Sequence, residues 1–193
     1  MSRTFSELEV GGNTREIEKP PYVWGMVVAV TAFLLYALTL APTTAFWDAS
    51  EYIATAYTLG IPHPPGNPFF IFVAKVWSLL LAPTGLSVAV RINLFAAATS
   101  AAATGFFYLV AHRVLLGIFL DSRLARVAAL ASSIIGATAF TVWNQSNVNE
   151  KVYTLSLMII AIVSWLAVRW CDRGDEPGTE RYVLWALFLL AIG

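Results

Sequence analysis

Long apolar segments separated by short polar ones account for most of this chain of 193 residues. Residues 22–41 form a run of twenty without a charge, and residues 92–111 form another. A hydrocarbon core of about 30 Å needs roughly 20 apolar residues as a helix, so each run predicts a transmembrane helix. The pattern therefore predicts an all-α, polytopic transmembrane helix bundle. After the first span, the candidate spans are 88–112, 127–143, 152–169 and 182–193.

One apolar segment, 69–81, is ambiguous. Its thirteen residues reach only about 20 Å as a helix, and Lys75 interrupts them. It could cross the membrane with help from its flanks, or it could lie in the interface.

Cytoplasmic ends of spans are enriched in Lys and Arg. If the segment does not cross, nine basic residues are cytoplasmic: Arg3, Arg15, Lys19, Arg113, Arg123, Arg126, Arg169, Arg173 and Arg181. Three are outside: Lys75, Arg91 and Lys151.

A crossing at 69–81 would move six of those nine basic residues outside, so the layout without it is favoured. The N-terminus is then cytoplasmic, and the outer loops are 42–87 and 144–151. In the first outer loop we expect a short helix over Ala49–Leu59 with Gly60 as its cap. A rigid proline-rich turn follows and leads into an interfacial helix at 69–81. This loop is therefore expected to carry two membrane-surface helices.

The composition supports the membrane class and limits the partners. Hydrophobic residues make up 58% of the chain, charged residues make up 12%, and the mean hydropathy is +0.69. A net charge of zero argues against a nucleic-acid partner. The single cysteine, Cys171, forms no intrachain disulfide. Residues 1–21 are interpreted as a polar cytoplasmic segment. Residues 22–193 are interpreted as the N-terminal part of a longer transmembrane domain, because the last apolar run, 182–193, is too short to span.

Three acidic residues stand at the outer ends of apolar segments: Asp48, Glu51 and Glu150. An ionisable group near lipid is costly, so it is a functional candidate by default. The structural alternative for Asp48 and Glu51 is a capping box, because they are three residues apart at the start of a helix. Glu150 could likewise serve only to favour a helix N-terminus.

Three basic or titratable residues are candidates for binding a substrate. His63 lies between prolines, a rigid setting for a hydrogen-bond donor. Arg91 and Lys75 lie near the outer surface, where they could hold a phosphate group. The alternatives are a solvated histidine in a loop and two side chains that extend toward lipid headgroups.

All of these candidates except Lys75 belong to four short motifs. The motifs are Phe46-Trp47-Asp48-Ala49-Ser50-Glu51-Tyr52-Ile53-Ala54, His63-Pro64-Pro65-Gly66, Arg91-Ile92-Asn93 and Asn149-Glu150-Lys151-Val152-Tyr153. With them, residues 22–193 resemble a bacterial membrane family long labelled only as a domain of unknown function. Its eukaryotic relatives are protein O-mannosyltransferases acting on receptor ectodomains, and the wider resemblance is to membrane glycosyltransferases of the GT-C fold.

The resemblance implies an acidic motif and two membrane-surface helices in the first outer loop, and a second acid in the next outer loop. Asp48 matches the catalytic acid of the first loop, and Glu150 matches the second acid, which is usually Asp in the family. Glu51 is a third catalytic candidate, although Ala49 and Ser50 separate it from Asp48, whereas the family usually has adjacent acids. The His-Pro-Pro stretch that follows the acidic motif in protein mannosyltransferases matches the one at His63.

The sequence and the resemblance together predict the N-terminal part of a GT-C-type glycosyltransferase in a bacterial inner membrane. The donor would be a polyprenyl-phosphate sugar, with mannose suggested by the resemblance. The acceptor would be a hydroxyl of a protein or envelope glycan outside the cytoplasm, with membrane lipid as the surrounding partner.

In this prediction Asp48 acts as general base, Glu150 orients a substrate, and His63 and Arg91 contact the carrier phosphate. No metal ligand and no certain cofactor are assigned, and the carboxylates leave a divalent metal open. The alternative function is that of a transporter or a non-catalytic membrane scaffold subunit.

Overall fold

The computed structural model describes residues 19–45, 47–119, 121–174 and 176–192. Within them the chain forms α-helices and one short 3-10 helix, and no strand, so the predicted all-α class is confirmed. Most of the predicted polar segment 1–21 lies outside the described residues. The elements are α1 (Tyr22–Leu38), α2 (Ala49–Thr58), α3 (Pro68–Leu80), η2 (Ala82–Thr84), α4 (Val88–Ile118), α5 (Ser122–Thr138), α6 (Phe140–Asn147), α7 (Tyr153–Arg173) and α8 (Glu180–Ile192).

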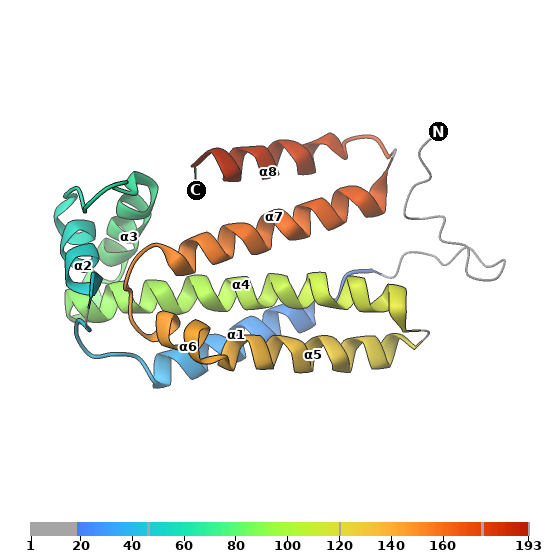
Figure 1. Cartoon of the computed structure of the whole chain (residues 1–193), viewed down its shortest axis with the longest axis horizontal. Helices are drawn as coiled ribbons and strands as arrows, with labels where there is room; N and C mark the ends of the chain where they lie inside the picture. Colours follow the sequence, from blue (N-terminus) through green and yellow to red (C-terminus); the bar gives the residue numbers. More distant parts are fainter. Residues whose placement is uncertain (1–18, 46, 120, 175, 193) are drawn as a thin grey trace.

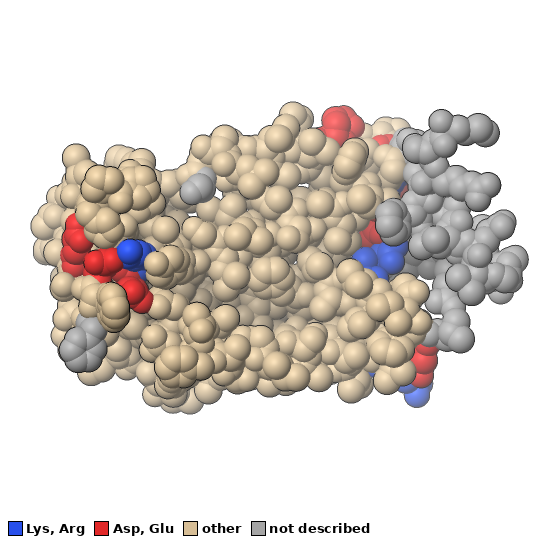
Figure 2. Space-filling model, in the orientation of Figure 1, with Lys and Arg blue, Asp and Glu red and all other residues tan. Residues whose placement is uncertain are grey.

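Helix α4 is the centre of the fold. α1, α5 and α7 pack along it, and α8 packs against α7 (Figure 1). α2 and α3 lie instead across one end of this bundle (Figure 1). We call this the α2–α3 end, and we include in it the connection 148–152 between α6 and α7. Figure 2 shows charged side chains toward the two ends of one face, with a broad band of other residues between them, as expected for a bundle in lipid.

Two helices are long and apolar enough to cross a membrane, by length and composition: α4 with 31 residues and α7 with 21. α5 and α6 make a third if they are counted as one broken span. α1 has 17 residues and α8 has 13, fewer than the roughly 20 that a full span needs. α1 ends at Leu38, three residues before the end of the predicted span 22–41. The N–H of Ala41 donates to the carbonyl oxygen of Asn147 at 3.0 Å, a partner outside the helix. The described helices therefore fit a membrane protein. Two or three of them can span by length and composition, whereas the sequence predicted four spans and a fifth run, 182–193, too short to cross.

Two glycines allow α1 and α4 to approach closely. A Cβ atom added to Gly105 of α4 would lie 2.8 Å from the carbonyl oxygen of Gly25 in α1 and 3.0 Å from the Cβ of Ala29. Neither distance leaves room for a side chain. The small residues of this stretch therefore serve the close packing that membrane helices obtain from them.

The predicted span 127–143 is broken in the structure. α5 ends at Thr138, and α6 begins after an extended Ala139 at an angle of 62°. The buried hydroxyl of Tyr36 donates to the carbonyl oxygen of Ala137 at 3.0 Å. In a continuous helix that carbonyl would accept from the residue four positions later, so the tyrosine supplies the partner that the break removes. Because α6 extends to Asn147, the non-helical connection is 148–152 rather than the predicted loop 144–151.

The α2–α3 end is held to the bundle by an apolar cluster. Tyr52 of α2 packs edge-on against Phe70 of α3, which packs edge-on against Phe95 of α4. Leu155 and Ile159 of α7 complete this buried group. The rings fix both short helices across the end of α4, so the side chains at the start of α2 hold a set position relative to α7.

The cap of α2 differs from the prediction by one residue. The left-handed position that ends the helix is Leu59, with φ 57°, rather than Gly60. The N–H of Gly60 donates to Thr55 O at 2.9 Å, which satisfies one of the last carbonyl groups of the helix.

Candidate functional site

Asp48 stands at the N-cap position immediately before α2, but its side chain does not cap the helix. Its side chain forms no hydrogen bond with the N-terminal amides of α2. Instead, Oδ2 lies 2.7 Å from Lys151 Nζ and 4.0 Å from His63 Nε2. The carboxylate therefore faces the connection 148–152 and the proline-rich turn, and one third of the side chain is exposed.

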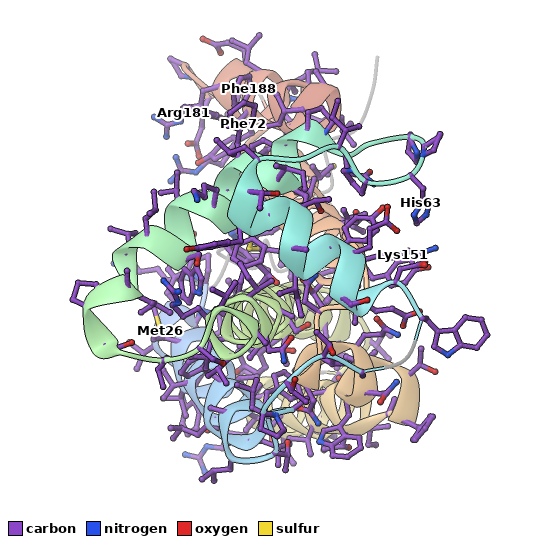
Figure 3. The ribbon with its side chains drawn as sticks, turned by 90° about the vertical axis from the view of Figure 1, so that its left-hand side faces the viewer. Met26, His63, Phe72, Lys151, Arg181 and Phe188 are labelled. Atoms are coloured by element: carbon purple, nitrogen blue, oxygen red, sulfur yellow. The ribbon has the colours of Figure 1, made fainter. Side chains whose placement is uncertain are left out.

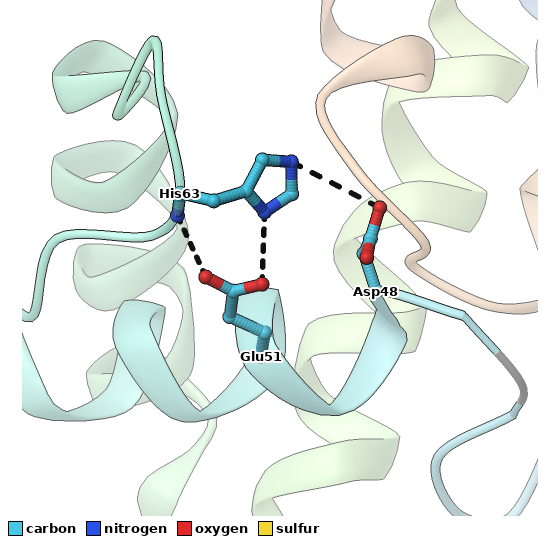
Figure 4. A group of neighbouring side chains, drawn as sticks. All are labelled: Asp48, Glu51 and His63. Carbon is cyan, nitrogen blue, oxygen red and sulfur yellow. Dashed lines mark hydrogen bonds and ion pairs between the residues drawn. The ribbon is translucent and has the colours of Figure 1, made fainter.

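Glu51 likewise does not complete the capping box. Its Oε1 accepts a hydrogen bond from the backbone N–H of His63 at 2.6 Å, and its Oε2 lies 2.9 Å from His63 Nδ1. The two contacts hold both the backbone and the ring of the histidine (Figure 4). They turn Nε2 of the ring toward Asp48, so the three side chains form one group. The ring edge of Tyr52 packs against the imidazole, with centroids 5.7 Å apart.

The ionic interactions set the charge of this group. The hydrogen bond from Lys151 holds the pKa of Asp48 below its usual value, with a smaller contribution from His63. The hydrogen bond from the His63 side chain, followed by the one from its backbone, lowers the pKa of Glu51. The hydrogen bond to Asp48 raises the pKa of Lys151. Both carboxylates therefore stay ionised, and Lys151 stays protonated, around neutral pH.

Glu150 lies on the same connection as Lys151, which places the third predicted acid at the α2–α3 end. Its carboxylate accepts a hydrogen bond from the side-chain amide of Gln145 in α6. Figure 3, which looks onto this end, shows Lys151 and His63 at the same edge of it. The ion pair between Lys151 and Asp48 thus joins the two loops that the sequence analysis places on one side of the membrane.

Arg91 and Lys75 have other partners. Arg91 is buried near the start of α4, and its Nη1 donates to the carbonyl oxygen of Ser78 at 2.7 Å. Lys75 donates to the carbonyl oxygen of Tyr57 and lies over the ring of that tyrosine, 4.6 Å from its centroid. Neither side chain forms a hydrogen bond or ion pair with the acidic group. Arg91 ties α3 to α4, and Lys75 ties α3 to the end of α2.

Two residues of the site were not singled out by the sequence analysis, Lys151 and Asn93. The side-chain nitrogen of Asn93 donates to the carbonyl oxygens of Ala41 and Thr43 at 2.9 and 3.1 Å. Its oxygen accepts from the N–H of Asn149 at 2.9 Å. Lys151 and Asn93 both lie inside the motifs that carry the family resemblance, and Lys151 directly follows Glu150. These two facts are the signals in the sequence that could have identified them.

A divalent ion is the cofactor that this group could hold. One ligand atom from each of Asp48, Glu51 and His63 lies within 4.8 Å of the other two. Oxygen and imidazole ligands at such spacing suit several divalent metals. The ammonium group of Lys151 already compensates part of the negative charge at Asp48, so a metal would have to compete with it.

An apolar groove of about 260 Å³ opens beside this group, between the start of α3, the start of α7 and the end of α8. It begins next to the proline-rich turn, at Pro65, and next to Lys151, at Val152. The remaining lining residues are Asn67, Pro68, Phe69, Phe70, Leu155, Ser156, Ile159 and Ile192. The arrangement therefore combines a charged, partly exposed group with an apolar groove that runs along the first turns of α7.

Comparisons with known proteins point to one family. Residues 48–193 match the family described as Protein O-mannosyl-transferase TMEM260 N-terminal domain. The Protein O-mannosyl-transferase tmem260 of Dictyostelium discoideum is 25% identical over 157 residues, which cover 81% of this chain and 18% of that protein. The Protein O-mannosyl-transferase TMEM260 of Mus musculus is 28% identical over 144 residues, covering 75% of this chain and 19% of that protein. The chain thus spans about a fifth of the length of these curated relatives. No solved structure matches it.

Proposed function

The chain belongs to the family of the Protein O-mannosyl-transferase TMEM260 N-terminal domain, and from that membership we propose that it carries the acidic site of a membrane glycosyltransferase. The donor is a sugar linked to a polyprenyl phosphate, and the names of the two relatives favour mannose. The acceptor is a hydroxyl of a protein or an envelope glycan. The reaction takes place on the outer side of a bacterial inner membrane, with the chain's N-terminus in the cytoplasm, within a fold of the GT-C type.

The observation that carries this proposal is the state of the Asp48 carboxylate. A general base must be ionised, accessible and free to accept a proton. One third of the Asp48 side chain is exposed, and its Oδ1 forms no hydrogen bond or ion pair within the described residues, so this oxygen is accessible to a substrate hydroxyl. Neither Asp48 nor Glu51 caps α2, so a capping box does not account for the acidic motif.

In the proposed reaction, Asp48 Oδ1 accepts the proton of the acceptor hydroxyl as its oxygen attacks the anomeric carbon of the donor. The new glycosidic bond forms while the bond between that carbon and the phosphate oxygen breaks, and the polyprenyl phosphate leaves. Glu51 acts by holding His63 through Nδ1. When the ring is protonated on both nitrogens, its Nε2–H can donate a hydrogen bond to the departing phosphate. Glu150 orients a substrate at the same end.

The surroundings of the site support a lipid-linked donor. The apolar groove lined by α3, α7 and α8 begins at Pro65 and Val152, close in sequence to His63 and Lys151, so an isoprenoid chain could lie in it with its phosphate near His63. The lipid itself would anchor the donor, and no nucleotide site is needed. A divalent ion held by Asp48, Glu51 and His63 would add a further positive charge at the phosphate.

The alternative is a transporter or a scaffold subunit. Transport sites lie near the middle of the membrane and are built from broken helices and charges inside spans. The helix pair α5 and α6 is broken, but residues 133–147 around the break contain no charged residue. In this structure the candidate group lies at one end of the bundle, and the middle of the face in Figure 2 shows no charged side chain among the described residues. That distribution favours chemistry at a membrane surface.

The test is the variant Asp48→Asn in the full-length protein. Asparagine has nearly the same shape but cannot accept the proton, so transfer of labelled mannose from a polyprenyl-phosphate donor in membranes should fall by about 10²–10⁴-fold. The matched control is Asp121→Asn, where the residue caps α5 and asparagine caps equally well. Transfer by Asp48→Asn at the wild-type rate would remove the catalytic assignment.

A further inference from the structure

Lys151 is the cation in direct contact with the candidate base, and it comes from the other loop. Its Nζ lies 2.7 Å from Asp48 Oδ2, and the two side chains are 29% and 33% exposed. An ion pair with this exposure contributes little to folding stability. The main effect of this ion pair is therefore on the orientation of the Asp48 carboxylate.

The ion pair decides which oxygen of Asp48 is available. Oδ2 is engaged by Lys151 and faces His63, whereas Oδ1 has no polar partner within the described part of the chain. A carboxylate on a short side chain can otherwise turn about its last bond and exchange the two oxygens. With Oδ2 held, Oδ1 keeps one direction, and a base with a fixed direction needs no reorientation before it accepts a proton.

The position of Lys151 depends on a buried anchor. Two residues before it, the N–H of Asn149 donates to the side-chain oxygen of Asn93, which is fully buried. One residue after it, the carbonyl of Val152 accepts from Ser156 and starts the hydrogen-bonding of α7. The backbone is thus held at Asn149 and at Val152, on either side of Lys151, and the Lys151 side chain extends from this segment to Asp48.

The same anchor holds the first loop. The nitrogen of Asn93 donates to Ala41 and Thr43, a few residues before Asp48. The side-chain amide of Asn93 on α4 therefore hydrogen-bonds to both loops. The ion pair between Asp48 and Lys151 is a second connection between the same two loops. A shift of the second loop would move Lys151 and release the carboxylate.

We propose that Lys151 is a positioning residue for the transfer reaction: it orients the Asp48 carboxylate toward the acceptor and makes that orientation depend on the second loop. This inference rests on the proposed function. Because Lys151 acts through Asp48, its loss lowers kcat and leaves KM for the donor nearly unchanged.

The experiment uses the full-length protein with Lys151→Met and Lys151→Arg, and with Arg123→Met as the matched control at the opposite, exposed end of the fold. Lys151→Met should lower kcat by about 10–100-fold, because orientation of a catalytic group is worth factors of this size. Lys151→Arg, which can still donate to Asp48, should recover most of the rate. On the Asp48→Asn background, Lys151→Met should cause no further loss, as expected for two residues that act together.

An assay that does not depend on activity separates this inference from the proposed function. A zero-length carbodiimide cross-linker should join Asp48 to Lys151, detected by mass spectrometry as a peptide that links the two loops. Absence of that cross-link overturns the inference even if the protein transfers sugar. So does a wild-type rate for Lys151→Met, or a rate for Lys151→Arg as low as that of the methionine variant. A cross-link in a wild-type protein that transfers no sugar refutes the proposed function, and the positioning role with it.

Discussion

The side-chain oxygen of Asn93 accepts a hydrogen bond from the backbone N–H of Asn149 at 2.9 Å, within the interior of the α2–α3 end. The nitrogen of the same side chain donates to two carbonyl oxygens of the loop that leads to Asp48. One buried amide therefore connects α4 with both segments that supply the acidic group. Such a residue influences a site without touching a substrate.

Replacement of Asn93 by leucine should destabilise the protein and lower its activity. Leucine has a similar shape but leaves an N–H and two carbonyl groups without their partner, and each unsatisfied buried group costs about 1–3 kcal/mol. Thermal unfolding of the purified protein should show a lower Tm, and sugar transfer should fall with it. Asn144→Leu, at an exposed position of α6, is the control and should change stability by less than about 0.5 kcal/mol. Equal melting temperatures for the two variants would contradict the anchoring role.

The crossing of α1 and α4 should not tolerate a methyl group at Gly105. In Gly105→Ala the new Cβ would lie 2.8 Å from Gly25 O, so the helices must separate, at a cost of about 1–3 kcal/mol. Gly117→Ala, in the same helix with nothing within 4 Å of its added Cβ, should instead be stabilised by up to about 1 kcal/mol through helix propensity. Melting temperatures of the two variants should move in opposite directions. A neutral Gly105→Ala would show that the helices do not meet at these glycines.

The bend between α5 and α6 should depend on the hydroxyl of Tyr36. Tyr36→Phe keeps the ring and removes the donor to Ala137 O, which should lower the free energy of unfolding by about 0.5–1.5 kcal/mol. The comparison is Tyr57→Phe, because Lys75 contacts the ring of Tyr57 rather than its hydroxyl. Chemical or thermal unfolding of both variants checks this. An unchanged stability in Tyr36→Phe would mean that the break in α5 needs no outside partner.

The contribution of Glu51 to stability should disappear at low pH. Its pKa is lowered by the His63 side chain and then by the His63 backbone, so the folded protein binds its proton less tightly than the unfolded chain does. The stabilisation is present above the unfolded value of about 4.3 and is lost as the pH falls through the lower folded value. Glu51→Gln should therefore melt below the wild type at pH 7, and the difference should shrink below about pH 4. A difference that stays constant down to pH 3 would show that the carboxylate charge is not what holds His63.

The helical class of this chain and its membrane character follow from the sequence alone. Apolar runs and charge placement are local features, and helix formation depends on contacts between residues three or four positions apart. The same reasoning separated 69–81 from the long spans, and α3 indeed lies across the end of the bundle rather than along it (Figure 1). The motifs around Asp48 and Glu150 likewise pointed to the family that the comparisons show.

The partners of those residues were decided by tertiary structure. Spacing left a capping box between Asp48 and Glu51 open as the structural alternative, but in the fold Asp48 contacts Lys151 and Glu51 contacts His63 instead. At the break after Thr138, the carbonyl of Ala137 accepts from a hydroxyl of α1, and beside the site the N–H of Asn149 donates to the buried amide of Asn93. Except for His63, twelve residues from Glu51, each of these partners lies far away in the sequence. Periodicity cannot identify such contacts, because they exist only after the helices have packed and brought distant backbone groups within hydrogen-bonding distance.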